Sequence, residues 1–299
     1  MRLWFGCVII KVMRNLFFVL ILFMSSINPV FAIKIGLLTD VSSAGVGTSG
    51  DGVIIDARTN RTVLELKQMR GYMIVPKKEH MAIKVDGTYK DIESDRIVVK
   101  SYQDGFVSTK KKWYRGYLIV QNCNGKLTVI NDVDLESYLK GVIPSEMPTS
   151  WDVEAHKAQA IAARSYALAN LGKRANKGYD LDDTPKDQAY GGASAENQGT
   201  TKAVNDTRGI VLTHNQKIIS AFYTASAGGK TKTANAAWGG NVPYLRSVPS
   251  YDGHIGRRGH GVGMSQHGAN NLAKQGYNAY QILKYFYKDV SFARLKSEI

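Results

Sequence analysis

A single segment of this 299-residue chain combines strong helix-forming composition with a face of small side chains. The segment runs from Asp152 to Gly178 and reads DVEAHKAQAIAARSYALANLGKRANKG. Acidic residues at its start and basic residues at its end suit the helix dipole, so we expect a helix of about 20 residues, capped by Thr149 or Ser150. A small face recurs at helical spacing: Ala158, Ile161, Ala162, Ser165 and Ala169. Such a face requires another backbone to pack closely against it.

The region before this helix has a different character. Residues 33–130 contain short runs rich in Val, Ile and Tyr, such as GVIIDA, RIVVKS and GYLIVQN, separated by Gly, Asp and Asn. These runs are typical of strands joined by turns. The sequence therefore predicts an α+β protein, with a β-rich N-terminal region at 33–130 and a mixed α/β region with an Ala-rich helix at 131–299.

The first 32 residues resemble an export signal. Three basic residues, Arg2, Lys11 and Arg14, flank or precede an apolar run over residues 16–24, and Val-Phe-Ala at 30–32 matches a signal-peptidase site. The run is shorter than the ~20 residues that a spanning helix needs. We expect a cleaved signal peptide, with an uncleaved membrane anchor as the alternative. Both predict an exported chain, outside the cytoplasm and associated with the cell wall or membrane.

The net charge limits the kinds of partner that the chain could bind, and the cysteine content limits the disulfides that it could form. The net charge of +14 becomes +11 without the first 32 residues, because 36 basic and 25 acidic residues remain. Outside the cell this favours a wall polymer or an anionic membrane over nucleic acid, although solubility alone also explains it. Without Cys7, Cys123 has no partner for an intramolecular disulfide, and we expect it to be buried as a small apolar side chain.

A carboxylate stands between two prolines just before the Ala-rich helix. The stretch KGVIPSEMPTSW, residues 140–151, places Glu146 between Pro144 and Pro148. Prolines stiffen the chain and remove backbone donors, which suits a rigidly positioned acid. An ordinary surface residue in a helix-entry loop is the alternative.

Four motifs occur in order along the chain: LESYLKGVIPSEMP, AIAARSYAL, FYTASAGGKT and GHGVGMSQHGA. Together they resemble the SpoIID/LytB family, which contains stage II sporulation protein D and the amidase enhancers, over roughly residues 114–290. The resemblance implies an exported peptidoglycan-processing protein, whose sporulation branch acts as lytic transglycosylases. It also implies that 131–299 is the catalytic region and carries the substrate groove.

The resemblance assigns candidate site residues. It places the family's acid on Glu146, and substrate-binding residues at Arg164, Tyr223, Lys230, His260, Ser265 and Gln266. Some relatives bind zinc through His and Cys in the TASAGG segment, where this chain has Thr and Ala. We therefore expect no zinc and no other cofactor.

The residue types allow further interpretation. Apolar neighbours would raise the pKa of Glu146 toward neutrality, as an acid catalyst requires. A direct Arg164 contact would lower that pKa, so we expect Arg164 to hold substrate or to act from behind the acid; an ion pair with Glu154 or Asp152 is the alternative. His254, His260 and His267 do not have the spacing of a zinc signature, and Ser265 suits a helix N-cap.

Two functions follow. The first is a lytic transglycosylase that cleaves the bond between N-acetylmuramic acid and N-acetylglucosamine, forms a 1,6-anhydro product and uses Glu146 as its single general acid and base. The alternative is a non-catalytic glycan-binding enhancer of an N-acetylmuramoyl-L-alanine amidase. Both predict peptidoglycan glycan strands as partner, with a wall amidase as a further partner, in wall remodelling or sporulation.

Overall fold

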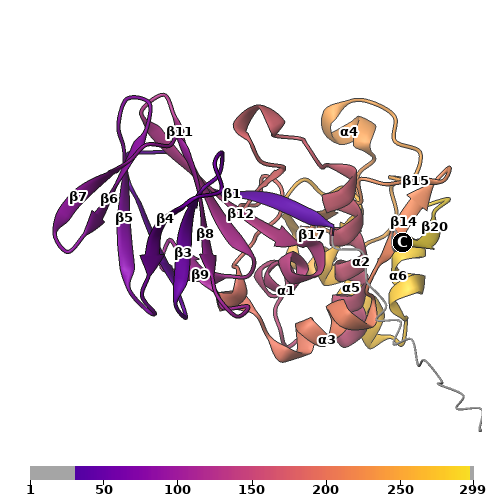
Figure 1. Ribbon diagram of the computed structural model, residues 1–299. Helices are drawn as coiled ribbons and strands as arrows, with labels where there is room; N and C mark the ends of the chain where they lie inside the picture. Colours follow the sequence, from indigo (N-terminus) through magenta and orange to yellow (C-terminus); the bar gives the residue numbers. More distant parts are fainter. Residues whose placement is uncertain (1–30, 297–299) are drawn as a thin grey trace, which may run out of the picture.

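The computed structural model describes residues 31–296, in which most of the strands gather on one side and the helices, with a few short strands, on the other (Figure 1). The signal or anchor predicted at 1–32 lies almost wholly outside the described residues. Within the described part of the chain, no helix is long and apolar enough to cross a membrane.

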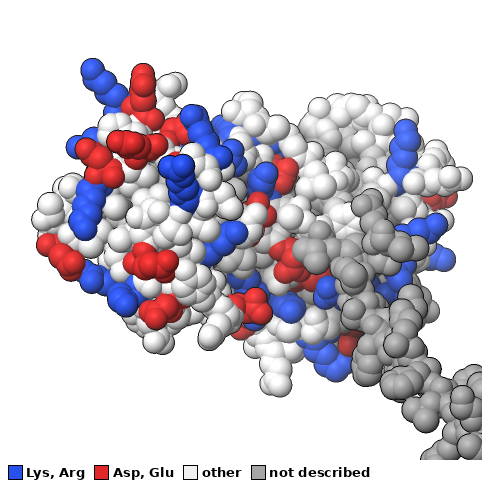
Figure 2. Space-filling model, viewed as in Figure 1, with Lys and Arg blue, Asp and Glu red and all other residues white. Residues whose placement is uncertain are grey.

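The β-rich half forms two sheets. Its strands are β1 (Ala32–Val41), β2 (Ala44–Thr48), β3 (Gly52–Asp56), β4 (Thr62–Leu66), β5 (Gly71–Pro76), β6 (Met81–Val85), β7 (Thr88–Ile92), β8 (Arg96–Ser101), β9 (Val107–Thr109), β10 (Lys112–Tyr114), β11 (Tyr117–Cys123) and β12 (Lys126–Asp134). One sheet has the order β13-β1-β12-β11-β8-β3-β4, where β13 is Leu181–Asp182, and the other has the order β10-β9-β2-β5-β6-β7. Their inward faces share one hydrophobic core. Figure 2 shows acidic and basic side chains interspersed over this half on the face in view.

Strand β12 runs directly into helix α1 (Leu135–Glu146). Asp134 ends the strand and also caps the helix, because its side chain accepts a hydrogen bond from the Ser137 amide. Buried α1 side chains, including Tyr138 and Leu139, extend the core of the sheets into the helical half. The predicted division into domains near residue 130 stays a prediction, since one core spans it.

The Ala-rich segment forms α2 (Val153–Ala169), as predicted, and lies at the centre of the helical half. Its cap is Asp152 rather than Thr149 or Ser150. Buried alanines on one side of α2 pack into the core of the sheets, whereas Ala158, Ile161 and Ala162 pack into a second core. Small side chains thus serve both faces, although Ala169 is exposed.

The second core is completed by the C-terminal elements. They are α3 (Gln198–Asp206), β14 (Ile210–His214), β15 (Lys217–Ile218), β16 (Tyr223–Thr224), β17 (Ser226–Ala227), α4 (Ala234–Trp238), β18 (Arg257–Arg258), β19 (Met264–Ser265), α5 (Gln266–Lys274), α6 (Ala279–Phe286) and β20 (Ser291–Arg294). Three 3-10 turns lie at Ala175–Lys177, Ala193–Ala195 and Gly253–Ile255. Strands β14 and β15 form a hairpin, with Asn215 at its turn. The predicted α+β class is confirmed.

Candidate active site

Glu146 is the last residue of α1, not part of a loop as the two prolines suggested. Pro144 lies in the last helical turn. Met147 precedes Pro148 and adopts an extended conformation (φ −133°, ψ 143°), as residues before proline usually do. Pro148 therefore ends the helix directly after the carboxylate.

Three donors hold the Glu146 carboxylate. Oε1 accepts hydrogen bonds from the Ala189 amide at 2.7 Å and the Tyr223 hydroxyl at 3.4 Å. Oε2 accepts one from Gln266 Nε2 at 3.3 Å. The acid is thus fixed by groups 43, 77 and 120 residues away in the sequence.

Burial raises the pKa of Glu146 above its ordinary value. The Ala189, Gln266 and Tyr223 donors oppose this effect without cancelling it. The C-terminal end of a helix also disfavours an ionised carboxylate, because its unpaired carbonyl groups carry partial negative charge. Glu146 is therefore suited to hold a proton at higher pH than an ordinary glutamate.

Parallel pairing of β16 with β19 brings two predicted residues to this acid. Tyr223 pairs with Met264, and Thr224 pairs with Ser265, so Gln266 begins α5 beside the tyrosine. Ser265 caps α5 through its contact with the Gly268 amide, as predicted for a cap. Its side chain is fully buried and does not line the cavity, so direct substrate binding by Ser265 does not fit this placement.

A cavity of about 440 Å³ opens beside Glu146. The residues that line it come from distant parts of the sequence. They are Glu146, Tyr166, Lys173, Pro185, Lys186, Asp187, Phe222, Tyr223, Thr224, Ala225, Arg258, Gly259, His260 and Gln266. Aromatic rings and cations therefore line the cavity together with two carboxylates, Glu146 and Asp187.

His260 and Lys230 differ in placement. His260 lines the cavity at an exposed rim, and its ring meets the Trp238 ring edge-on at 5.4 Å between centroids. Lys230 is exposed, pairs through its backbone with Pro249 and is not among the lining residues. The structure thus brings Tyr223, His260 and Gln266 together with Glu146 but leaves Lys230 outside.

Arg164 is fully buried behind the site. Its guanidinium forms a two-point ion pair with Glu136 of α1, at 2.8 and 2.7 Å, and donates to the Ile210 carbonyl at 3.0 Å. The predicted substrate contact of Arg164 does not fit this placement, and neither does pairing with Glu154 or Asp152. The arginine instead fastens α2 to the helix that ends at Glu146.

No motif in the sequence singled out the segment 182–189. Asp187 anchors it: Lys173 Nζ lies 2.6 Å and Arg174 Nε 2.7 Å from its carboxylate, which also accepts the Asp182 amide at 2.8 Å. Burial alone would raise the pKa of Asp187, but these donors outweigh it and lower the pKa. The anchored segment presents the Ala189 amide to Glu146.

A second residue that the sequence did not mark is Asp252, which joins the segments around Ala227 and Ser265. Its fully buried carboxylate accepts hydrogen bonds from the Ala227 amide at 2.7 Å, the Gly229 amide at 2.8 Å and the Ser265 hydroxyl at 2.5 Å. Burial alone would raise its pKa, but hydrogen bonds, including one from Ser250, outweigh burial and lower the pKa to about 2. No sequence pattern marked this aspartate, because its donors are scattered along the chain.

Asp252 is expected to stabilise the fold in a pH-dependent way. A lowered carboxyl pKa contributes stability above the unfolded value of 3.8, and that contribution is lost as pH falls toward about 2. The urea midpoint of Asp252→Asn should therefore lie well below that of the wild type near neutral pH and approach it at acid pH. Asp104→Asn, at an exposed position, is the control. A gap that stays constant with pH would contradict this account.

Among the described residues, no group of three or more His, Cys, Asp or Glu side chains could hold a metal ion.

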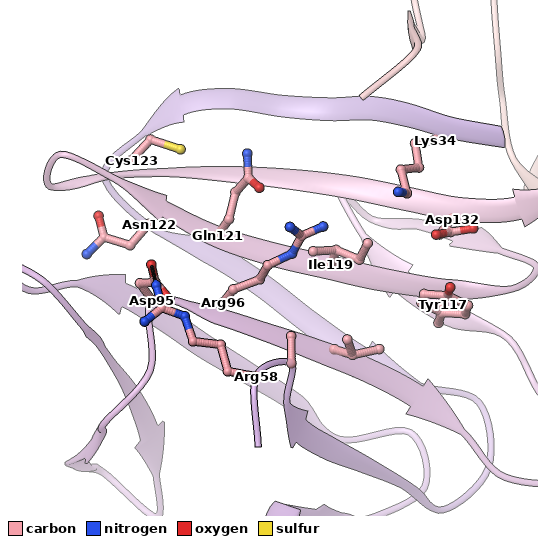
Figure 3. A pocket seen from close by; sticks show the side chains of 12 residues that line it. Lys34, Arg58, Asp95, Arg96, Tyr117, Ile119, Gln121, Asn122, Cys123 and Asp132 are labelled. Atoms are coloured by element: carbon pink, nitrogen blue, oxygen red, sulfur yellow. Dashed lines mark hydrogen bonds and ion pairs between the residues drawn. The ribbon is translucent and has the colours of Figure 1, made fainter. Parts of the chain in front are cut away.

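A separate hollow of about 590 Å³ lies on the outer face of the seven-stranded sheet (Figure 3). There, Asp95 pairs with Arg58 at 2.5 Å. Cys123 is exposed, so the expectation that it is buried is wrong. The carboxylates that line this hollow are Asp95 and the buried Asp132.

Comparisons with known proteins find a matching family model and several relatives. The family model described as Stage II sporulation protein (SpoIID) matches residues 123–214, which include Glu146 and Arg164. An uncharacterised protein of Brachyspira hyodysenteriae is 37% identical over 196 residues, which cover 65% of this chain and 49% of that protein. The amidase enhancer of Bacillus subtilis is 48% identical over 107 residues, 36% of this chain and 14% of that protein.

A stage II sporulation protein D, from Bacillus amyloliquefaciens, is 29% identical over 263 residues, with 56% of this chain and 76% of that protein covered. The chain spans about half the length of the Brachyspira relative and a small part of the amidase enhancer. The family-model match contains two of the four motifs, LESYLKGVIPSEMP and AIAARSYAL. Through the region of residues 123–214, this chain is therefore similar to the SpoIID family.

Proposed function

We propose that this protein is an exported lytic transglycosylase that cleaves peptidoglycan glycan strands with Glu146 as its single acid and base. One observation carries the proposal. Two carboxylates line the cavity in the described chain, and Asp187 is held ionised by Lys173 and Arg174. Glu146, whose pKa is raised, is the one suited to give up and regain a proton.

The chemistry needs one such group. Glu146 donates its proton to the glycosidic oxygen as the bond from muramyl C1 to that oxygen breaks. It then accepts the proton of the muramyl 6-hydroxyl while that oxygen bonds to C1, which closes the anhydro ring and restores the acid. No water enters, so the second carboxylate of ordinary glycosidases is not required. The lining aromatics Tyr166 and Phe222 suit stacking on sugar rings.

The second candidate, an amidase enhancer, is supported by the 48% identity with the Bacillus subtilis protein of that name. In that case the cavity would bind glycan without cleaving it. We expect retained binding of glycan and faster release of stem peptides by an added amidase.

Product analysis separates the two. Glycan strands stripped of stem peptides are incubated with the purified protein, and the products are identified by mass spectrometry. Anhydro-muramyl ends support the transglycosylase, and reducing ends would indicate a hydrolase instead. Intact strands, together with stimulation of an amidase on strands that carry peptides, would overturn the proposal in favour of the enhancer.

A further inference from the structure

A chain of buried hydrogen bonds runs behind Glu146. The Gln188 side chain is fully buried between α1, α2 and β16. Its Nε2 lies 2.9 Å from the Tyr223 hydroxyl, and its Oε1 lies 3.2 Å from the Tyr138 hydroxyl. Tyr223 in turn lies 3.4 Å from Glu146 Oε1. Four side chains from distant parts of the sequence thus form one line that ends at the acid.

A backbone carbonyl fixes the direction of this line. Gln188 Nε2 also lies 3.3 Å from the Ala163 carbonyl oxygen, which can only accept a hydrogen bond. The amide nitrogen must therefore face Ala163, and Gln188 Oε1 must face Tyr138. The second amide hydrogen then points at the oxygen of Tyr223, so the Tyr223 hydroxyl must donate to another group, and Glu146 Oε1 is the acceptor within reach.

Glu146 Oε1 accepts a second hydrogen bond from the same segment. Its donor, at 2.7 Å, is the backbone amide of Ala189, the residue after Gln188. With two donors aimed at Oε1, a proton on that oxygen would face other hydrogens. A proton on Oε2 meets only the Gln266 amide, which can rotate to accept it.

We propose that Gln188 is a positioning residue that directs the Tyr223 hydroxyl onto Glu146 Oε1 and thereby confines the transferable proton of Glu146 to Oε2. This inference rests on the proposed function for its catalytic meaning. Both proton transfers then use one oxygen: Oε2 gives its proton to the glycosidic oxygen and takes the proton of the 6-hydroxyl.

The test follows the titration of Glu146 in the folded protein, by NMR of ¹³C-labelled glutamate carboxyls assigned with Glu146→Gln. Tyr223→Phe removes a donor to the carboxylate, so the Glu146 pKa should rise. Gln188→Met leaves Tyr223 in place but frees its hydroxyl to turn, so the pKa should rise in the same direction. The double variant should match Tyr223→Phe, since both changes interrupt one line.

Gln159 is a matched control. Like Gln188 it is fully buried, but it lies on α2 and its side chain has no hydrogen-bond partner in the described structure. Gln159→Met should leave the titration of Glu146 unchanged. An unshifted Glu146 pKa in Gln188→Met, or additive shifts in the double variant, would overturn the inference, since a purely structural role predicts either result.

A second measurement needs no substitution at Gln188. In the wild type, the side-chain amide signals of Gln188 should move with pH in step with Glu146, and this movement should vanish in Glu146→Gln. Signals that do not move would also overturn the inference. Neither readout uses glycan, so a protein that shows the linked titration without cleavage would refute the proposed function alone.

Discussion

Glu146→Gln is expected to slow glycan cleavage by about 10²–10⁴-fold, or roughly 3–5 kcal/mol in the barrier. Glutamine keeps the size of the side chain and can still accept from the Ala189 amide, but it has no proton to give to the leaving oxygen. Both transfer steps use this one group, so no second carboxylate replaces it. The measurement is the initial rate of anhydro-muramyl product formation.

The same variant should fold normally, because Glu146 makes no ion pair in the described structure. Its thermal midpoint should match that of the wild type, which separates lost chemistry from lost structure. Glu93→Gln, at an exposed position after β7, is the matched control and should keep the full rate. Cleavage by Glu146→Gln at more than a tenth of the wild-type rate would exclude Glu146 as the general acid.

Arg164→Met is expected to lower the free energy of unfolding by about 3–5 kcal/mol. The substitution leaves the Glu136 carboxylate buried without its charge partner, although the Gly209 amide still donates to it at 3.2 Å. It also leaves the Ile210 carbonyl without the guanidinium. Urea unfolding followed by circular dichroism measures the effect.

Two control variants test whether the lower free energy of unfolding comes from the buried ion pair. Arg70→Met breaks an exposed pair with Asp86 and should leave the urea midpoint nearly unchanged. The double variant Arg164→Met with Glu136→Leu should recover part of the stability, because no unpaired charge remains buried. A loss of less than about 1 kcal/mol for Arg164→Met would show that the buried pair does not hold α1 to α2.

Local patterns predicted the parts of the fold that depend on local forces. The Ala-rich composition predicted α2, and runs of Val, Ile and Tyr separated by turn residues predicted the strands of the β-rich region. Helix α1 was missed because Pro144 and Pro148 suggested a loop. The lost backbone bond at Pro144 is outweighed by burial of the apolar side chains of α1 against the sheets, which a local pattern does not reveal.

In the candidate site as well, some residues were predicted from the sequence and others were not. The family motifs identified Glu146, Tyr223, His260 and Gln266, which the fold brings to one cavity, and their chemical roles stay predictions. Of the two roles expected for Arg164, the one behind the acid fits its burial. Its partner, Glu136, was not predicted because it lies in the helix that was missed. The positions of Asp187, Gln188 and Asp252 depend on donors far away in the sequence, so their residue types alone carried no signal.

The junction at Asp134 has a mechanical consequence for Glu146. One residue ends β12 and begins α1, so no flexible joint separates the central sheet from the acid three helical turns away. At its other end, α1 places Glu146 against the amide of Ala189 and the side chains of Tyr223 and Gln266. The position of the carboxylate is therefore set by the sheet at one end of the helix and by these three donors at the other.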